Sequence, residues 1–288
     1  MLILAAAPLG NPRDASKHVK EAIVQATHIA AEDSRKFSRL CKDLGIVYTA
    51  RVISFFEGNE IERVDELLAI MKSGNDLLVI TDAGLPGVSD PGYRLIRAAL
   101  ESKIEIKVIP GPSAVTTALL LSGAPTDRFC FEGFLPRTGG ARLSALKKLE
   151  REERTMIFFE APHRLPEFLA DALAVFGEKR AGAICREMTK TYEETIRGSA
   201  QELSDWAEQN EVLGEITVVF EGFDPTSQSY SQSDYINLVM AKESAGMPRK
   251  EAIAEVAHEI GAAKRDVFDA MVASKIQGDK KSSPQDKM

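Results

Sequence analysis

Residues suited to binding a polar ligand and to moving a proton occur in six short segments, each of which follows an apolar run. The richest is residues 81–92, which carries Asp82 and Asp90 among several glycines and prolines directly after Leu77–Ile80. In an open α/β sheet, a loop at the end of a buried strand is where the ligand binds. The other five segments are residues 8–11, 32–35, 110–113, 160–163 and 186–190.

These loops are expected to converge on one cleft, because the carboxyl ends of parallel strands share one edge of the sheet. The sequence contains no P-loop and no GxGxxG motif after its first strand, which disfavours nucleoside triphosphates and dinucleotides. Short Gly, Ala and Ser loops favour a polar ligand held through backbone groups, with Asp82 or Glu160 supplying negative charge. A sulfonium cation with an adenosyl group suits that description, although composition alone does not name it.

The sequence leaves two roles open for the pair Glu187 and Lys190, and also for His163. Glu187 and Lys190 are three residues apart after a predicted strand, so they form either a local ion pair or a pair that positions the substrate. A lysine acts as a general base when burial depresses its pKa. His163 is equally consistent with a structural role and a functional one.

The cysteines indicate neither a disulfide framework nor a zinc site. Cys41, Cys130 and Cys185 are far apart, and no CxxC or Cys/His ligand spacing occurs. We therefore expect no metal, and we expect buried thiols in a protein of the reducing cytoplasm.

Composition indicates a globular protein with a sizeable core. The chain has 288 residues, 44% of them hydrophobic, and a net charge of −7. No apolar run approaches the length of about 20 residues needed to span a membrane. The apolar start, residues 1–7, is predicted to be a strand rather than a signal peptide, since no basic residue precedes it.

The negative net charge argues against nonspecific coating of nucleic acid but not against a local basic face. Basic residues gather in two stretches, at residues 35–42 and 137–154. Each stretch is either a solvated helix face or a track for a phosphate backbone.

The pattern of apolar residues predicts two α/β domains with a mainly parallel sheet. We expect a first domain over residues 1–122, a hinge at 122–125 and a second domain over 123–223. Residues 224–232 are expected to be a linker, 233–277 a small helical appendix and 278–288 a disordered tail. The expected strands are residues 2–7, 29–31, 77–80, 106–109, 129–134, 155–159, 181–186 and 215–221.

Two residues are expected to begin helices. Ser113 is placed to cap the helix that follows the Pro-Gly-Pro turn. Asp90 is predicted to cap the helix that follows the loop of residues 81–92, and Pro91 to be its first residue. In that interpretation, Asp82, Ala83 and Gly84 bind the ligand, and residues 89–92 only begin the helix.

Eight segments in this order resemble the tetrapyrrole (corrin/porphyrin) methylase superfamily. They are PLGNPRD, EDSRKFSRLCKDLGI, TDAGLPGVSDPG, IPGPSAVTTALLLSGAP, FEGFLP, FFEAPHRL, REMTKTYEE and GEITVVF. The chain is most similar to the bacterial branch that 2′-O-methylates a cytidine of small-subunit ribosomal RNA. Ala7, Ser34 and Leu85 depart from that pattern, since threonine is common at all three positions.

The resemblance implies an S-adenosylmethionine-dependent methyltransferase, dimeric and cytoplasmic, with the cofactor in the cleft between two domains. Its partner would be small-subunit ribosomal RNA or the assembled subunit. The implied cofactor contacts are Pro8, Asp82, Ala83, Gly84, Val88, Ser113, Ala114, Glu160 and Met188. The implied catalytic residues are Lys190 with Glu187 for hydroxyl activation, and Glu32 and Arg35 for positioning. The implied RNA contacts are Arg35, Lys36, Arg39, Arg137, Arg142 and Arg164.

Two rival functions remain at this stage. The first is a methyltransferase of the same superfamily that acts on a tetrapyrrole or another small molecule. The second is an RNA-binding or assembly factor that has lost its donor site, which the intact loops at residues 82–84 and 110–113 argue against.

Overall fold

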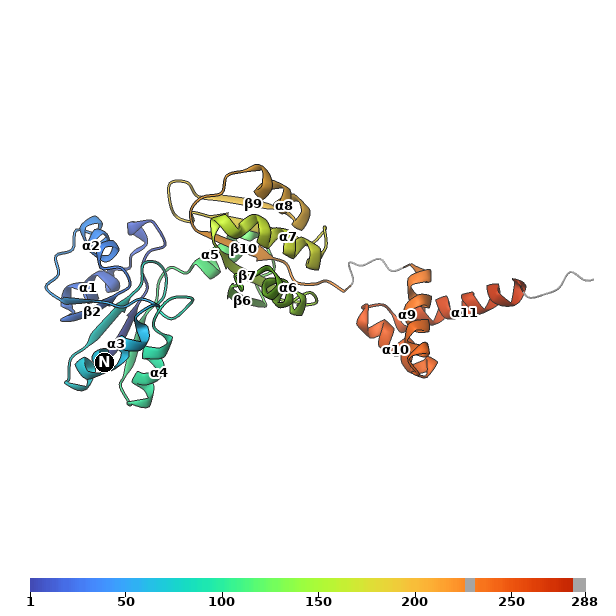
Figure 1. Ribbon diagram of the computed structural model, residues 1–288, viewed down its shortest axis with the longest axis horizontal. Helices are drawn as coiled ribbons and strands as arrows, with labels where there is room; N and C mark the ends of the chain where they lie inside the picture. Colours follow the sequence, from blue (N-terminus) through green and yellow to red (C-terminus); the bar gives the residue numbers. More distant parts are fainter. Residues whose placement is uncertain (226–230, 282–288) are drawn as a thin grey trace, which may run out of the picture. The chain divides into compact units, whose positions relative to one another are not determined.

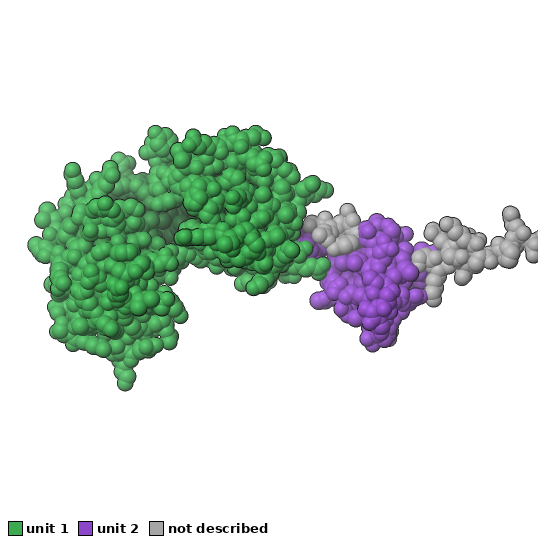
Figure 2. Space-filling model, viewed as in Figure 1, with its two compact units in different colours: residues 1–222 green, residues 223–288 purple. Residues whose placement is uncertain are grey.

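The structure is a computed structural model that describes residues 1–225 and 231–281, with side chains to residue 273. The chain forms two compact units, Met1–Gly222 and Phe223–Met288 (Figure 2). Within the described residues, no helix is long and apolar enough to cross a bilayer.

The larger unit contains two sheets with helices packed on them (Figure 1). The first sheet is fully parallel, with the order β3-β2-β4-β1-β5. Helices cover both faces: α1 and α2 pack on one, and α3 and α4 on the other. The strands are β1 (Leu2–Ala5), β2 (His28–Ala31), β3 (Arg51–Ser54), β4 (Leu77–Ile80) and β5 (Ile106–Ile109). The helices are α1 (Lys17–Gln25), α2 (Ser34–Asp43), α3 (Glu60–Lys72) and α4 (Tyr93–Glu101), with a 3₁₀ turn at Pro12–Asp14.

The second sheet is mixed, which corrects the expectation of a mainly parallel arrangement. Its order is β6-β7-β10-β8-β9, with β10 antiparallel to both neighbours and β9 antiparallel to β8. Helices α6, α7 and α8 pack on one face. The strands are β6 (Phe129–Phe134), β7 (Thr155–Glu160), β8 (Ala181–Arg186), β9 (Glu194–Ser199) and β10 (Ile216–Phe220). The helices are α6 (Gly139–Lys148), α7 (Leu165–Phe176) and α8 (Ala200–Gln209), with a 3₁₀ turn at Pro162–Arg164.

Helix α5 (Ala114–Ser122) covers the other face of the second sheet, not the first. Its Val115, Ala118 and Leu119 pack with Ile157 and Val219. The chain therefore crosses from one sheet to the other at residues 110–113, and the hinge expected at 122–125 is wrong. The reason is that the partners of the apolar face of α5, such as Ile157 and Val219, come from strands much later in the chain.

The described residues of the smaller unit form three helices, α9 (Gln232–Ser244), α10 (Arg249–Glu259) and α11 (Lys264–Lys281). They share a core that includes Val239, Val256 and Val267. The predicted tail is wrong at its start, since α11 continues to Lys281. Residues 226–230 of the predicted linker and 282–288 of the tail lie outside the described residues.

Helix α4 does not begin at Asp90 and Pro91, as the sequence predicts. The helix begins at Tyr93, and its cap position is Gly92 in the positive-φ region, at 136°. The buried Glu60, from the first turn of α3, accepts hydrogen bonds from the backbone N–H groups of Gly92 (3.0 Å) and Arg94 (3.1 Å). A distant carboxylate thus satisfies the helix end, which leaves Asp90 available for another role.

Replacing Glu60 by alanine should lower the free energy of unfolding by about 1–3 kcal/mol, because the N–H groups of Gly92 and Arg94, the first of them buried, lose their acceptor. Urea denaturation of the two variants Glu60→Ala and Glu62→Ala checks this, since Glu62 is an exposed neighbour on α3. The control should stay within about 0.5 kcal/mol of the native protein. Equal losses in both variants would contradict the assigned role of Glu60.

Candidate functional site

Two adjoining cavities lie in the larger unit, where the loops of both sheets meet. We call the part built on β1–β5 the first lobe and the part built on β6–β10 the second lobe. Figure 2 shows the recess between them. The first cavity has a volume of about 410 Å³ and is lined by loops that follow β4, β7 and β8 and by the start of β10. The second has a volume of about 480 Å³ and is lined mainly by residues 8–12, by α2 and by the end of β4.

At one edge of the second sheet, the ends of β7 and β8 lie beside the start of β10. Since β7 and β8 are both antiparallel to β10, their carboxyl ends lie beside its first residue, Ile216. Glu215 directly precedes β10 and lines both cavities. The sequence interpretation missed Glu215, because it treated only the residues after strands as candidates.

Eight of the nine residues predicted to contact a cofactor line the first cavity, and Pro8 lines the second. The eight are Asp82, Ala83, Gly84, Val88, Ser113, Ala114, Glu160 and Met188. Ser113 occupies the cap position of α5, but its side chain makes no capping hydrogen bond. The predicted cap position is therefore confirmed, but the side chain does not cap the helix, and its hydroxyl is available to the cavity. The ligand contacts themselves stay predictions.

Asp90 belongs to the wall of the first cavity, together with Ser89. Burial raises the pKa of Asp90 to about 7, and the nearby carboxylates Glu32, Asp82 and Glu215 add to the rise. The sequence signal for this role was weak, because Asp-Pro-Gly also begins helices.

Glu160 belongs to the wall of the same cavity, and one oxygen of its buried carboxylate has no partner among the described residues. Its side chain is buried, Oε1 lies 3.2 Å from Nε of Arg164, and Oε1 also accepts the N–H of Ala161 at 2.7 Å. No described residue hydrogen bonds to Oε2. Burial raises the pKa of Glu160 in spite of the neighbouring cations Arg164 and Arg142.

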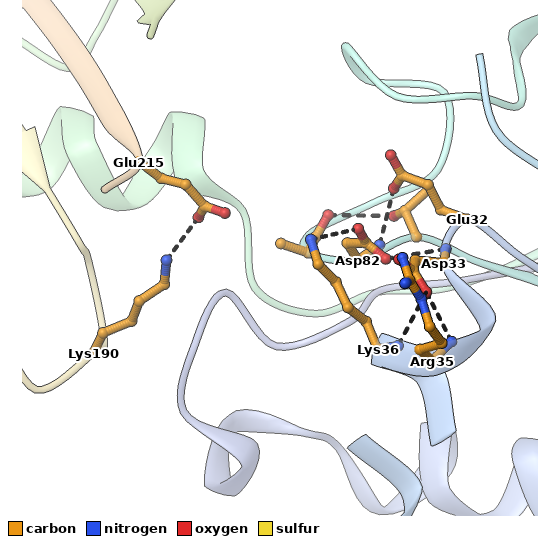
Figure 3. Close-up of polar contacts among 9 residues, drawn as sticks. Glu32, Asp33, Arg35, Lys36, Asp82, Lys190 and Glu215 are labelled. Carbon is orange, nitrogen blue, oxygen red and sulfur yellow. Dashed lines mark hydrogen bonds and ion pairs between the residues drawn. The ribbon is translucent and has the colours of Figure 1, made fainter. Parts of the chain in front are cut away.

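A chain of hydrogen bonds joins the ends of β2 and β4. The backbone N–H of Asp82 donates to Glu32 Oε2 (3.0 Å), and that of Asp33 donates to Asp82 Oδ1 (3.2 Å). Lys36 Nζ donates to Asp82 Oδ2 at 2.8 Å. Burial raises the pKa of Glu32, more than the hydrogen bond from Asp82 lowers it. Figure 3 shows this group on one side and Lys190 with Glu215 on the other.

Lys190 is held between two carboxylates, Glu187 Oε1 at 2.8 Å and Glu215 Oε2 at 3.0 Å. Burial alone would lower the pKa of Lys190, but these two hydrogen bonds raise it overall. A lysine held as a cation is a poor proton acceptor. The structure therefore argues against Lys190 as the base and supports a positioning role, with Glu187 as its anchor.

Lys190 also brings the two lobes together. A Cβ at Gly10 would lie 2.2 Å from Lys190 Cγ, so only glycine leaves room for the lysine stem there. The neighbouring N–H of Asn11 donates to Thr189 Oγ1 at 3.2 Å. Both Glu187 and Thr189 have positive φ, which is uncommon outside glycine and concentrates at functional segments.

The residues predicted to bind RNA differ in their accessibility. Arg137 is exposed, Arg35 is paired with Asp33 and lines neither cavity, and Lys36 and Arg39 line the second one. The prediction for Arg142 is wrong: it is 3% exposed and pairs with Asp171 and Glu167.

Arg164 is mostly buried beside Glu160 and donates to the carbonyl of Leu135 at 2.9 Å. Its guanidinium therefore supports the cavity wall rather than an outer surface. His163 is exposed and lines neither cavity. In the described part of the chain, no group of three metal-ligating side chains could hold a metal ion.

Comparison with known proteins assigns the family. The model of the family "Tetrapyrrole (Corrin/Porphyrin) Methylases" matches residues 1–204. The chain belongs to this family. A relative from Mycobacterium tuberculosis named "Ribosomal RNA small subunit methyltransferase I" is 46% identical over 275 residues, which is 95% of each chain. A relative of the same name from Thermotoga maritima is 40% identical over 221 residues, covering 77% of this chain and 98% of that one.

A solved structure shows the same fold. Uroporphyrin-III C-methyl transferase from Thermus thermophilus, complexed with S-adenyl homocysteine, superimposes with a TM-score of 0.55. The match covers 76% of this chain and 96% of that chain at 16% identity. The two-domain α/β expectation is confirmed, as the two sheets of the larger unit also show.

Asp90→Asn should stabilise the protein increasingly as the pH rises from 4 to 7. The folded-state pKa is raised to about 7 from 3.8, so the unfolded state ionises first and the native protein loses stability across that interval. The stability difference between Asp90→Asn and the native protein should level off above pH 7. Melting temperatures at pH 5 and pH 8 check this, with the exposed Asp65→Asn as the control. A difference that does not depend on pH would contradict it.

Proposed function

We propose that this protein transfers a methyl group from S-adenosylmethionine to the ribose 2′-hydroxyl of a cytidine in small-subunit ribosomal RNA. The observation that carries the proposal is the 46% identity over 95% of both chains to a protein named as a small-subunit ribosomal RNA methyltransferase. The nucleotide and the 2′-oxygen are the finer part of the proposal, and they come from the eight sequence segments described above.

The first cavity fits the cofactor in size and chemistry. Its volume of about 410 Å³ lies within the range of small-ligand sites. Apolar side chains such as Leu85, Val88 and Phe159 suit an adenine ring, and the partnerless Oε2 of Glu160 suits a hydroxyl or ammonium donor. Asp82 and Asp90 add the negative charge that a sulfonium cation favours.

When bound, S-adenosylmethionine supplies an activated methyl group and needs no metal. The protein must then hold the ribose in line with that methyl group and remove the hydroxyl proton. Lys190, fixed by Glu187 and Glu215, offers a positive charge beside the second cavity. Glu32 offers a carboxylate between the two cavities.

The partner and the assembly are part of the proposal. We expect the substrate to be small-subunit ribosomal RNA or the assembled subunit, and we expect a cytoplasmic homodimer. The exposed Arg137 and the basic residues of α2 are the RNA contacts that agree best with the structure.

Incubation with methyl-labelled S-adenosylmethionine tests the function. Small ribosomal subunits that lack the modification should be labelled, and digestion of their RNA should yield 2′-O-methylcytidine. Uroporphyrinogen, offered in parallel, should stay unlabelled because the structural likeness to that transferase extends only to the fold. Labelling of the porphyrinogen alone would overturn the proposal.

Glu160→Gln should weaken binding of S-adenosylmethionine about 10- to 100-fold, because a charge-assisted hydrogen bond of about 1.5–3 kcal/mol is lost. Isothermal titration calorimetry measures the affinity, and the exposed Glu178→Gln serves as the control. Melting curves verify that the variant remains folded. An unchanged affinity would remove Glu160 from the cofactor site.

A further inference from the structure

The second cavity adjoins the first along a shared wall formed by six residues. They are Leu9, Glu32, Lys36, Asp82, Ala83 and Glu215. The chemistry of the two linings differs away from that wall. The first continues into Leu85, Phe134 and Ile216. The second continues into Arg39, Asp43 and Lys190, so it suits a charged and strongly hydrated ligand.

Arg39 is the notable cation of the second cavity. Arg35 and Lys36, on the same helix, pair with Asp33 and Asp82, whereas no described carboxylate pairs with Arg39. Its exposed guanidinium is available for a phosphate, which arginine binds well. Lys36 is a second donor, because an exposed ion pair such as Lys36–Asp82 is worth little and opens readily.

We propose that the second cavity receives the acceptor nucleotide, with Arg39 and Lys36 on its phosphate and Glu32 as the acceptor of the 2′-hydroxyl proton. This inference rests on the proposed function and assigns the substrate side of the same site. The volume of about 480 Å³ accommodates one nucleotide that has left its stack. The reacting oxygen and the methyl group must then meet at the shared wall.

Glu32 is the carboxylate of that wall best placed to accept a proton. Asp82 already accepts hydrogen bonds from Lys36 and from the N–H of Asp33, and Glu215 is bound to Lys190. Only Oε2 of Glu32 is engaged, by the N–H of Asp82. Asp33, Lys36, Asp82 and Asp90 are the charged groups that face it.

The proposed step balances. The bond between the methyl carbon and the sulfonium sulfur breaks, and its electron pair stays on sulfur. The ribose oxygen forms the new carbon–oxygen bond, and its proton passes to a carboxylate oxygen of Glu32. Burial, which raises the pKa of Glu32 above that of an ordinary carboxylate, makes it a better acceptor.

Binding of small ribosomal subunits tests the phosphate contact apart from catalysis. Arg39→Ala should weaken binding at every salt concentration and should lower the slope of log affinity against log salt by about 1. Lys42→Ala is the matched control, because it removes an exposed cation from the same helix but lies outside both cavities. A slope unchanged in Arg39→Ala, or reduced equally in both variants, would overturn the assignment of the cavity.

Glu32→Gln tests the proton acceptor, since glutamine keeps an oxygen for the N–H of Asp82. Affinities for S-adenosylmethionine and for subunits should change less than about threefold, whereas the single-turnover rate should fall about 10²- to 10⁴-fold. The rise of that rate with pH should also disappear. A rate and pH profile like those of the native protein would overturn the role of Glu32.

The single-turnover rate of Glu215→Gln, compared with that of Glu32→Gln, shows which of these two carboxylates accepts the proton. A greater loss of rate in Glu215→Gln than in Glu32→Gln would move the proton to Glu215 and overturn the assignment. If the native protein itself labels no small subunits, the proposed function fails instead. The salt dependence of Arg39→Ala still reports on the cavity in that case, because it does not depend on methyl transfer.

Discussion

The contact between residues 8–11 of the first lobe and residues 189–190 of the second is the constraint on which the site depends. Lys190 passes over Gly10 so closely that a Cβ there would overlap its stem, and Asn11 is hydrogen bonded to Thr189. The contact brings the loop edges of two separate sheets together, and both cavities lie along that junction. Glycine is required because one lobe's backbone must accept the other's side chain.

Negative charge is the second property that shapes the site. Glu32, Asp82, Asp90, Glu160 and Glu215 line the first cavity, with Lys36 as the cation among its lining residues. Burial of several carboxylates together raises the pKa values of Glu32, Asp90 and Glu160. This arrangement costs stability in the free protein and favours a cationic ligand, so binding of a cation and release of protons are physically coupled.

Most strands and helices could be predicted from the sequence, since their apolar residues follow regular periods. The strands Leu77–Ile80 and Ala181–Arg186 appear where the pattern predicts them. Strands β3 and β9 were not predicted, because their residues are mostly half-exposed and polar. The domain boundary failed at α5, whose apolar residues show that it is buried but not against which sheet.

The family and the loops of the site could be recognised from the amino-acid sequence, because these loops combine glycines, prolines and acidic residues in an order that resembles known methylases. Which side chains share a cavity depends on the three-dimensional fold. Asp90 lines the first cavity because Glu60 takes its place at the start of α4. Glu215 lines both cavities because β10 runs antiparallel to its neighbours. Arg142 is not on the expected RNA surface, because it is buried against Asp171 and Glu167. Such pairings connect residues distant in the chain, and no local pattern encodes them.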